Sequence, residues 1–171
     1  MVDKKFIIAG LDNSGKSSIV HSLMGSQNLL SIFAMQPTVG VNRELITLGE
    51  NNFNILDFGG QEVYRKEHID KNLKENLDST DKLIYVIDVQ DVERHDVSLN
   101  YLQQILNLID GKLQPEISIF IHKSDPDVEN QYQEIFESLV ANIKDLMPEG
   151  IQYKIFKTTI FTVFQKTPVF L

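Results

Sequence analysis

The sequence predicts an α/β protein built on a mostly parallel six-stranded sheet with one antiparallel edge strand. Short continuous apolar runs, such as Leu83–Ile87 and Ile117–Ile121, are typical of parallel strands that are covered on both faces. Longer stretches with apolar residues at helical spacing lie between these runs, and strands that alternate with helices favour a parallel sheet. Two alternating segments, Arg43–Leu48 and Phe53–Phe58, flank a polar turn at Gly49–Asn52 and predict an antiparallel hairpin.

The other elements follow in order along the chain. The first strand comes after four N-terminal residues, and a helix with apolar residues on one face comes next. Residues 26–42 lack a clean period and contain Pro37, so we expect a loop there. Pro126 stands where the first turn of a helix tolerates proline. The expected strands are 5–9, 43–48, 53–58, 83–87, 117–121 and 151–156, and the expected helices are 15–24, 92–109 and 126–143.

The composition is that of one soluble globular domain, with 171 residues of which 42% are hydrophobic and 23% charged. Because the chain has no Cys, a disulfide framework, a thiol nucleophile and a Cys-ligated zinc are excluded. The formal net charge of -8 argues against binding of nucleic acid or of an anionic membrane surface. Val2 excludes N-myristoylation, and no apolar run is long enough to span a membrane. We therefore expect a cytoplasmic protein without a direct membrane anchor, whose membrane contact comes only through a partner.

A glycine-rich motif carries the strongest chemical signal. Gly10-Leu11-Asp12-Asn13-Ser14-Gly15-Lys16-Ser17 matches G-x-x-x-x-G-K-[ST], directly after a predicted strand and at the start of a predicted helix. Backbone N–H groups of such a loop, together with the helix N-terminus, bind phosphate oxygens. Lys16 is expected to contact the β- and γ-phosphates and Ser17 to bind Mg²⁺. A chance glycine-rich turn is the alternative, and the register of strand and helix argues against it.

A second motif, Asp57-Phe58-Gly59-Gly60-Gln61, follows the third strand. Asp57 is placed to hold a metal ion through water, and Gly60 allows its backbone N–H to approach the γ-phosphate. The Gln61 amide both donates and accepts hydrogen bonds, as is needed to orient an attacking water. A plain turn at the glycines and a helix N-cap at Asp57 are the alternatives.

A third motif, His122-Lys123-Ser124-Asp125, follows the strand 117–121. Asp125 has the carboxylate that accepts hydrogen bonds from N1–H and the exocyclic amine of guanine, and the Lys123 stem is long enough to lie along the base. The alternative is a surface turn in which Asp125 caps the helix that begins at Pro126, and both readings can hold together.

These three motifs and Thr38, in this order and spacing, resemble the small GTPases, which are P-loop NTPases with a three-layer G domain. Within them the chain is most similar to the Arf and Rag branches, over residues 4–160. Gly10-Leu11-Asp12, Pro37–Asn42 and Gly59-Gly60-Gln61 are Arf-like. His122, in place of the usual Asn, and Lys157-Thr158-Thr159-Ile160 are Rag-like features.

The resemblance implies a GTP-binding molecular switch that slowly hydrolyses GTP to GDP, with Gln61 as the catalytic residue. Its cofactor is Mg²⁺, with Ser17, Thr38 and, through water, Asp57 as ligands. Two segments, residues 26–42 and 60–80, are irregular or highly charged. They correspond to the segments of small GTPases that become ordered only when a γ-phosphate is bound. Plain surface loops are the alternative. The nucleotide-binding residues that the motifs and the resemblance imply are Asp12, Asn13, Ser14, Gly15, Lys16, Ser17, Ser18, Thr38, Gly60, His122, Lys123, Asp125 and Ile160, the last through its backbone.

The sequence also departs from the family pattern. No Arg precedes Thr38 directly, so fast hydrolysis should need an arginine from an activating protein, which increases the rate about 10³–10⁵-fold. Arg43 and Arg65 are the nearby arginines, and we expect both at the surface or facing a partner. His122 lacks the amide of Asn, which implies weaker guanine affinity or an altered loop packing. The resemblance further implies an exchange factor, effector proteins and a possible heterodimer partner.

The chain is expected to form one domain, with the G domain in residues 1–160 and a short apolar tail of the same domain in residues 161–171. Eleven residues are few for the helix that closes such a fold, so this helix is expected to be short or missing, either because the chain is truncated or because the tail docks on the body or on a partner. A nucleotide-bound scaffold with negligible hydrolysis is the alternative function. An ATP-using P-loop kinase is a third reading, which the second and third motifs argue against.

Overall fold

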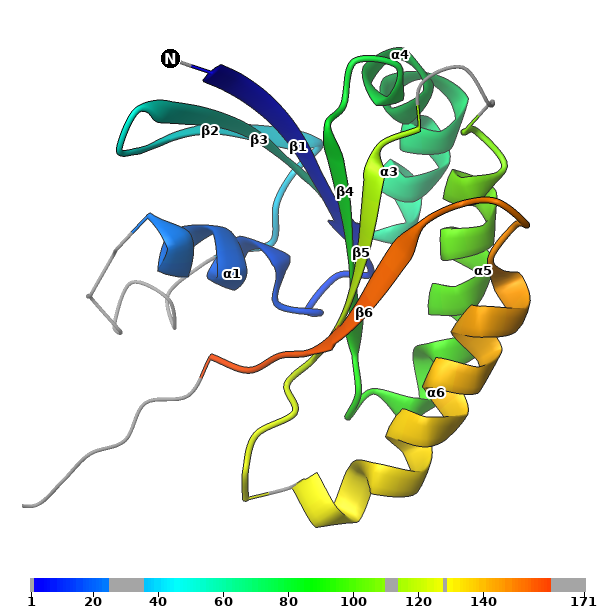
Figure 1. The fold of residues 1–171 in the computed structure, drawn as a ribbon. Helices are drawn as coiled ribbons and strands as arrows, with labels where there is room; N and C mark the ends of the chain where they lie inside the picture. The colour runs from blue at the N-terminus through cyan, green and yellow to red at the C-terminus, as the bar shows by residue number, and fades with distance from the viewer. Residues whose placement is uncertain (1, 25–35, 110–113, 128, 161–171) are drawn as a thin grey trace, which may run out of the picture.

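The computed structural model describes residues 2–24, 36–109, 114–127 and 129–160, which form a six-stranded sheet with helices on both faces (Figure 1). The strand order is β2-β3-β1-β4-β5-β6, where β2 and β3 are antiparallel and the other neighbours are parallel. This confirms the predicted α/β class, the parallel sheet and the antiparallel edge strand. The strands are β1 (Val2–Gly10), β2 (Val41–Leu48), β3 (Asn51–Phe58), β4 (Lys82–Asp88), β5 (Glu116–His122) and β6 (Tyr153–Lys157).

Helix α1 (Lys16–Leu23) covers one face of the sheet, and the other helices lie on the opposite face (Figure 1). The segment after β3 is helical throughout, with α3 (Glu62–Glu67) and α4 (Leu73–Leu77) joined by a wide π-helical turn, η1 (His68–Asn72). The remaining helices are the 3₁₀ turn η2 (Val92–Arg94), α5 (His95–Leu106), the 3₁₀ turn η3 (Glu129–Tyr132) and α6 (Gln133–Leu146).

Two apolar clusters, one on each face, explain the continuous apolar runs of the strands. Side chains of a strand point to alternate faces, so Tyr85 joins the larger cluster under α5 and α6, whereas Ile84 and Val86 join the smaller one beside α1. Full burial of each such side chain stabilises the fold by about 1.5–3 kcal/mol. The central strand therefore needs apolar residues at every position.

The face that carries α1 is covered less completely. Phe6, Phe53 and Phe120 are only partly buried there, and Phe156 is 41% exposed. The rings pack in pairs, Phe6 on Phe53 at 5.3 Å and Phe120 on Phe156 at 5.6 Å between centroids. The predicted apolar tail, residues 161–171, lies outside the described residues, so its role and the length of a closing helix stay predictions.

Several predicted boundaries were wrong. β1 begins at Val2 instead of Lys5, because residues 2–5 pair in register with residues 51–54 of β3. The hairpin turn is Gly49–Glu50 alone, with Gly49 in the left-handed region at φ +61°. The last strand begins at Tyr153, two residues later than predicted.

Two larger differences concern helices. Residues 60–80, for which the sequence predicts no helix, contain the helical segment 62–77, because Leu73 and Leu77 lie one turn apart and are both buried in the larger cluster. The helix predicted to begin at Pro126 begins with η3 at Glu129, and Asp125 contacts Thr159 and Gln90. Among the described residues, no helix combines the length and apolarity needed to cross a bilayer.

Candidate functional site

The predicted phosphate-binding loop connects β1 to α1, as its motif requires (Figure 1). Asn13 at φ +60° and Gly15 at φ +94° adopt left-handed backbone conformations that curl the loop. A Cβ atom at Gly15 would lie 2.5 Å from Cδ2 of His122, so only glycine fits between the loop and this ring. Ser14 is buried, and its hydroxyl has no hydrogen-bond partner among the described residues.

A cavity of about 190 Å³ opens in front of this loop. Lys16 lies on its inner wall and is only 5% exposed, and its Nζ donates a hydrogen bond to the Leu11 carbonyl at 2.7 Å. Burial lowers the pKa of Lys16 to about 8, although the carboxylates of Asp57 and Asp12 act in the opposite direction. The cavity is lined by Asp12, Asn13, Gly15, Lys16, Ser17, Ser18, Gln36, Pro37, Thr38, Gly60 and Gln61.

Three oxygen-bearing side chains from three separate elements meet at one point beside this cavity. The Ser17 hydroxyl donates a hydrogen bond to Asp57 Oδ2 and lies 3.0 Å from Thr38 Oγ1. Thr38 also donates to Asp57 Oδ2, at 3.2 Å. Asp57 Oδ1 is buried without a partner among the described residues, and burial raises the pKa of this carboxyl. Hydroxyl and carboxylate oxygens are the ligands that Mg²⁺ prefers, so these residues fit a divalent cation.

The segment after β3 lies directly against the phosphate-binding loop. A Cβ atom at Gly60 would be 2.1 Å from the backbone nitrogen of Asp12, which only glycine permits. Gly59 donates a backbone hydrogen bond to the Gly40 carbonyl at 2.7 Å, which joins this segment to the loop that carries Thr38. Gln61 is exposed at the start of α3, and its side chain lines the cavity without capping the helix.

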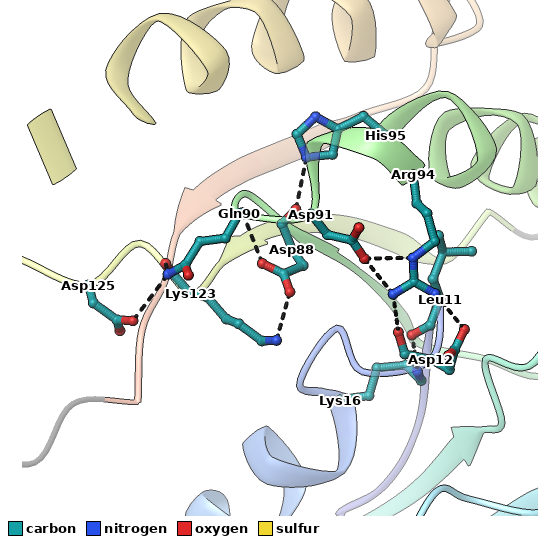
Figure 2. Close-up of polar contacts among 10 residues, drawn as sticks. All are labelled: Leu11, Asp12, Lys16, Asp88, Gln90, Asp91, Arg94, His95, Lys123 and Asp125. Atoms are coloured by element: carbon teal, nitrogen blue, oxygen red, sulfur yellow. Dashed lines mark hydrogen bonds and ion pairs between the residues drawn. The ribbon is translucent and has the colours of Figure 1, made fainter. Parts of the chain in front are cut away.

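The third motif forms a separate group of contacts at the ends of β5 and β6 (Figure 2). Lys123 Nζ pairs with Asp88 Oδ2 at 2.7 Å. Asp125 accepts hydrogen bonds from Thr159 Oγ1 and from Gln90 Nε2, the latter at 3.4 Å. These residues do not line the 190 Å³ cavity of the phosphate-binding loop. The structure thus brings the predicted phosphate-binding and metal-binding residues together and holds the predicted base-binding residues in a separate group of contacts.

His122 and Ile160 complete this group. His122 is buried, and its Nδ1 lies 3.0 Å from the Thr158 hydroxyl. Burial lowers the pKa of His122, so the neutral ring is favoured. Ile160 packs at the margin of the smaller apolar cluster.

The structure also places residues that the sequence did not single out. Arg94 Nη1 donates a hydrogen bond to Asp12 Oδ1 at 3.0 Å. The prediction named only Arg43 and Arg65 as arginines near the site, so it was incomplete. Arg65 is half-buried, with its guanidinium 5.5 Å from the centre of the Tyr101 ring, and Arg43 is exposed as expected. His68 is buried in η1 against Phe58, and burial lowers its pKa. No sequence motif marks Arg94, which lies 82 residues from Asp12.

Two comparisons agree with this geometry. The chain matches the Gtr1/RagA G protein conserved region over residues 5–165. It also resembles the solved structure of the Arl6 BBS3 small GTPase from Trypanosoma brucei with a bound nucleotide analogue, GppNp, with a TM-score of 0.71 and 25% sequence identity. That match covers 92% of this chain and 87% of the other. The predicted likeness to small GTPases of the Rag and Arf branches is confirmed, and the chain belongs to the Gtr1/RagA G protein family as a small GTPase domain.

Proposed function

We propose that this protein is a GTP-binding molecular switch that hydrolyses GTP to GDP slowly. The observation that carries the proposal is the convergence of buried Lys16 with the Ser17, Thr38 and Asp57 oxygens beside one cavity. A buried ammonium group next to a cluster of oxygen ligands suits a phosphate chain that is bound together with a cation. Membership of a small GTPase family implies that the nucleotide is a guanine nucleotide.

Each part of the site has a role in binding. Lys16 and the backbone N–H groups of residues 12–18 bind the β- and γ-phosphates. When bound by Ser17, Thr38 and, through water, Asp57, Mg²⁺ supplies positive charge that neutralises the phosphate oxygens. Asp125 accepts hydrogen bonds from the guanine base, with the Lys123 stem along the ring and the Ile160 backbone at the guanine carbonyl. Each Asp125 oxygen accepts one hydrogen bond from Gln90 or Thr159, and a carboxylate oxygen has a second lone pair that can accept from the base.

Hydrolysis depends on Gln61, which accepts a hydrogen bond from the attacking water and orients it. Its exposed position at the cavity rim, on a segment anchored by Gly60, supports this role. An activating protein supplies an arginine, and an exchange factor, effectors and a heterodimer partner are the other expected partners. The loop that carries Thr38 and the segment that begins at Gly60 change conformation with the γ-phosphate, because Thr38, Gly60 and Gln61 all line the cavity.

The base contact is tested with Asp125→Asn and with the exposed residue Asp127→Asn as a matched control. Mass spectrometry of the purified wild-type protein should find GDP or GTP. Asp125→Asn should shift the preference by about tenfold or more toward xanthine nucleotides, because an amide can donate to the carbonyl that replaces the guanine amine. An unchanged preference would contradict the assignment of Asp125.

Slow hydrolysis is distinguished from a nucleotide-bound scaffold with Gln61→Leu, with exposed Gln104→Leu as the control. On GTP-loaded protein, alone and with an activating partner, Gln61→Leu should lower the single-turnover rate by about two orders of magnitude. An unchanged rate would remove Gln61 from catalysis and favour the scaffold.

A further inference from the structure

Arg94 makes a set of polar contacts that reach the phosphate-binding loop from outside it (Figure 2). It stands at the end of η2, directly before α5. Its Nη1 donates to Asp12 Oδ1 at 3.0 Å and its Nη2 to the Asp12 carbonyl at 3.3 Å. Its Nε donates to Asp91 Oδ2 at 2.7 Å. One guanidinium therefore holds both the side chain and the backbone of Asp12.

The position of Asp12 gives these contacts a consequence for phosphate binding. Asp12 lines the same cavity as Lys16, where a free carboxylate would repel a polyanion. Its charge already acts on the cavity, since it raises the pKa of Lys16 against the effect of burial. Arg94 lies outside the cavity, so its ion pair with Asp12 reduces this repulsion without occupying the phosphate position, although Asp91 shares the same guanidinium.

Arginine suits this task better than lysine. Its planar guanidinium presents several fixed donors, so it can bind Asp12 Oδ1, the Asp12 carbonyl and Asp91 at the same time. Arg94 and Asp12 have side chains that are 37% and 39% exposed, so this ion pair contributes little to the stability of the fold. We therefore expect the contact between Arg94 and Asp12 to affect ligand affinity more than stability.

The same chain segment also contacts the predicted base-binding residues. Asp88 pairs with Lys123 at 2.7 Å, and Gln90 Nε2 donates to the Lys123 carbonyl at 2.7 Å (Figure 2). His95 Nε2 lies 2.9 Å from the Asp88 carbonyl and fixes the segment at its other end. Residues 88–95 therefore connect the phosphate-binding loop to the third motif, with Arg94 as the contact on the phosphate side.

We propose that Arg94 is a positioning residue of the nucleotide site, which holds Asp12 and offsets part of its negative charge so that the cavity accepts a γ-phosphate. This inference rests on the proposed function. Loss of Arg94 should weaken the binding of a nucleoside triphosphate more than that of a diphosphate, because the third phosphate adds negative charge close to Asp12.

The test compares Arg94→Ala, Arg94→Lys, Asp12→Asn and the double variant with Arg43→Ala, an exposed arginine, as the control. Affinities for GDP and for a non-hydrolysable GTP analogue are titrated in the presence of Mg²⁺, and thermal unfolding of the nucleotide-free proteins is recorded. Arg94→Ala should weaken binding of the GTP analogue by about tenfold and of GDP by less than about threefold. Arg94→Lys should lie between Arg94→Ala and the wild type.

The double variant separates positioning from general damage. Removal of the Asp12 charge should restore affinity for the GTP analogue to within about twofold of Asp12→Asn alone, with unfolding temperatures within about 3 °C. Equal losses for GDP and the analogue, or no rescue by Asp12→Asn, would overturn the role of Arg94 while leaving guanine nucleotide binding intact. A wild-type protein that binds neither nucleotide would instead overturn the proposed function, and this inference with it.

Discussion

Replacement of Lys16 by methionine should stabilise the nucleotide-free protein while it abolishes nucleotide binding. Lys16 is 5% exposed, and burial lowers its pKa from 10.5 to about 8. At about 1.4 kcal/mol for each pH unit, the charged amine costs the folded state about 3 kcal/mol at pH 7. Methionine has a similar length and no charge, but it loses the hydrogen bond to the Leu11 carbonyl, which contributes about 1 kcal/mol. We expect a net gain of about 2 kcal/mol in the free energy of unfolding.

The pH dependence of stability provides a second measurement of the free-energy cost of burying the Lys16 charge. Because the pKa of Lys16 is lower in the folded protein than in the unfolded chain, the unfolded chain binds more protons between pH 8 and pH 10.5. The stability of the wild-type protein should therefore gain a contribution as pH rises through this window, and Lys16→Met should lack it.

Urea unfolding of nucleotide-free protein at pH 7 and pH 9.5 measures both effects, and Lys74→Met, at an exposed lysine of α4, serves as the control. A Lys16→Met protein less stable than the wild type at pH 7 would refute the reasoning, because the buried ammonium would then be a net stabilising group. An unchanged affinity of this variant for GDP would separately remove Lys16 from the phosphate site.

Two further predictions concern neighbouring residues. Asp57→Asn should also stabilise the nucleotide-free protein near neutral pH, which urea unfolding measures. Burial raises the pKa of Asp57, so the wild-type protein loses stability as pH rises from the pKa of the unfolded chain through that of the folded protein. The same substitution should remove the effect of Mg²⁺ on GDP affinity, which a Mg²⁺ titration measures. Leu73→Ala should lower the free energy of unfolding by about 2–5 kcal/mol, because Leu73 is fully buried under the sheet. Exposed Val63→Ala in α3 should change it by less than about 1 kcal/mol, and equal effects of the two would contradict the inward packing of α4.

The parts of the fold that the sequence predicts correctly are those with a local signal. The apolar run Leu83–Ile87 is unambiguous, because a strand buried on both faces needs apolar residues at each position. The phosphate-binding loop is equally local, since its glycines, Lys16 and Ser17 lie within eight consecutive residues. Its position between β1 and α1 follows from the same motif.

The missed features depend on weak or distant signals. In the segment 62–77, charged residues on the exposed side outnumber the buried ones, and the spacing of Leu73 and Leu77 alone was too sparse to indicate a helix. The contact between Arg94 and Asp12 joins residues far apart in the chain, through the end of β4 and the turn η2. Such a contact follows from the topology of the sheet and not from any local pattern.

The π-helical turn at His68–Asn72 divides one continuous helical segment into two parts with different attachments. Leu73 and Leu77 fix the second part in the core, whereas α3 in the first part has no buried residue. A π-turn contains one residue more than an α-turn, and each residue of a helix corresponds to about 100° of rotation. Conversion of this turn to regular α-helix would thus rotate Tyr64 and its neighbours around the helix axis while Leu73 stays in place. Such a conversion would present a different set of side chains beside the cavity and would shift the hydrogen-bond register of the segment by one residue.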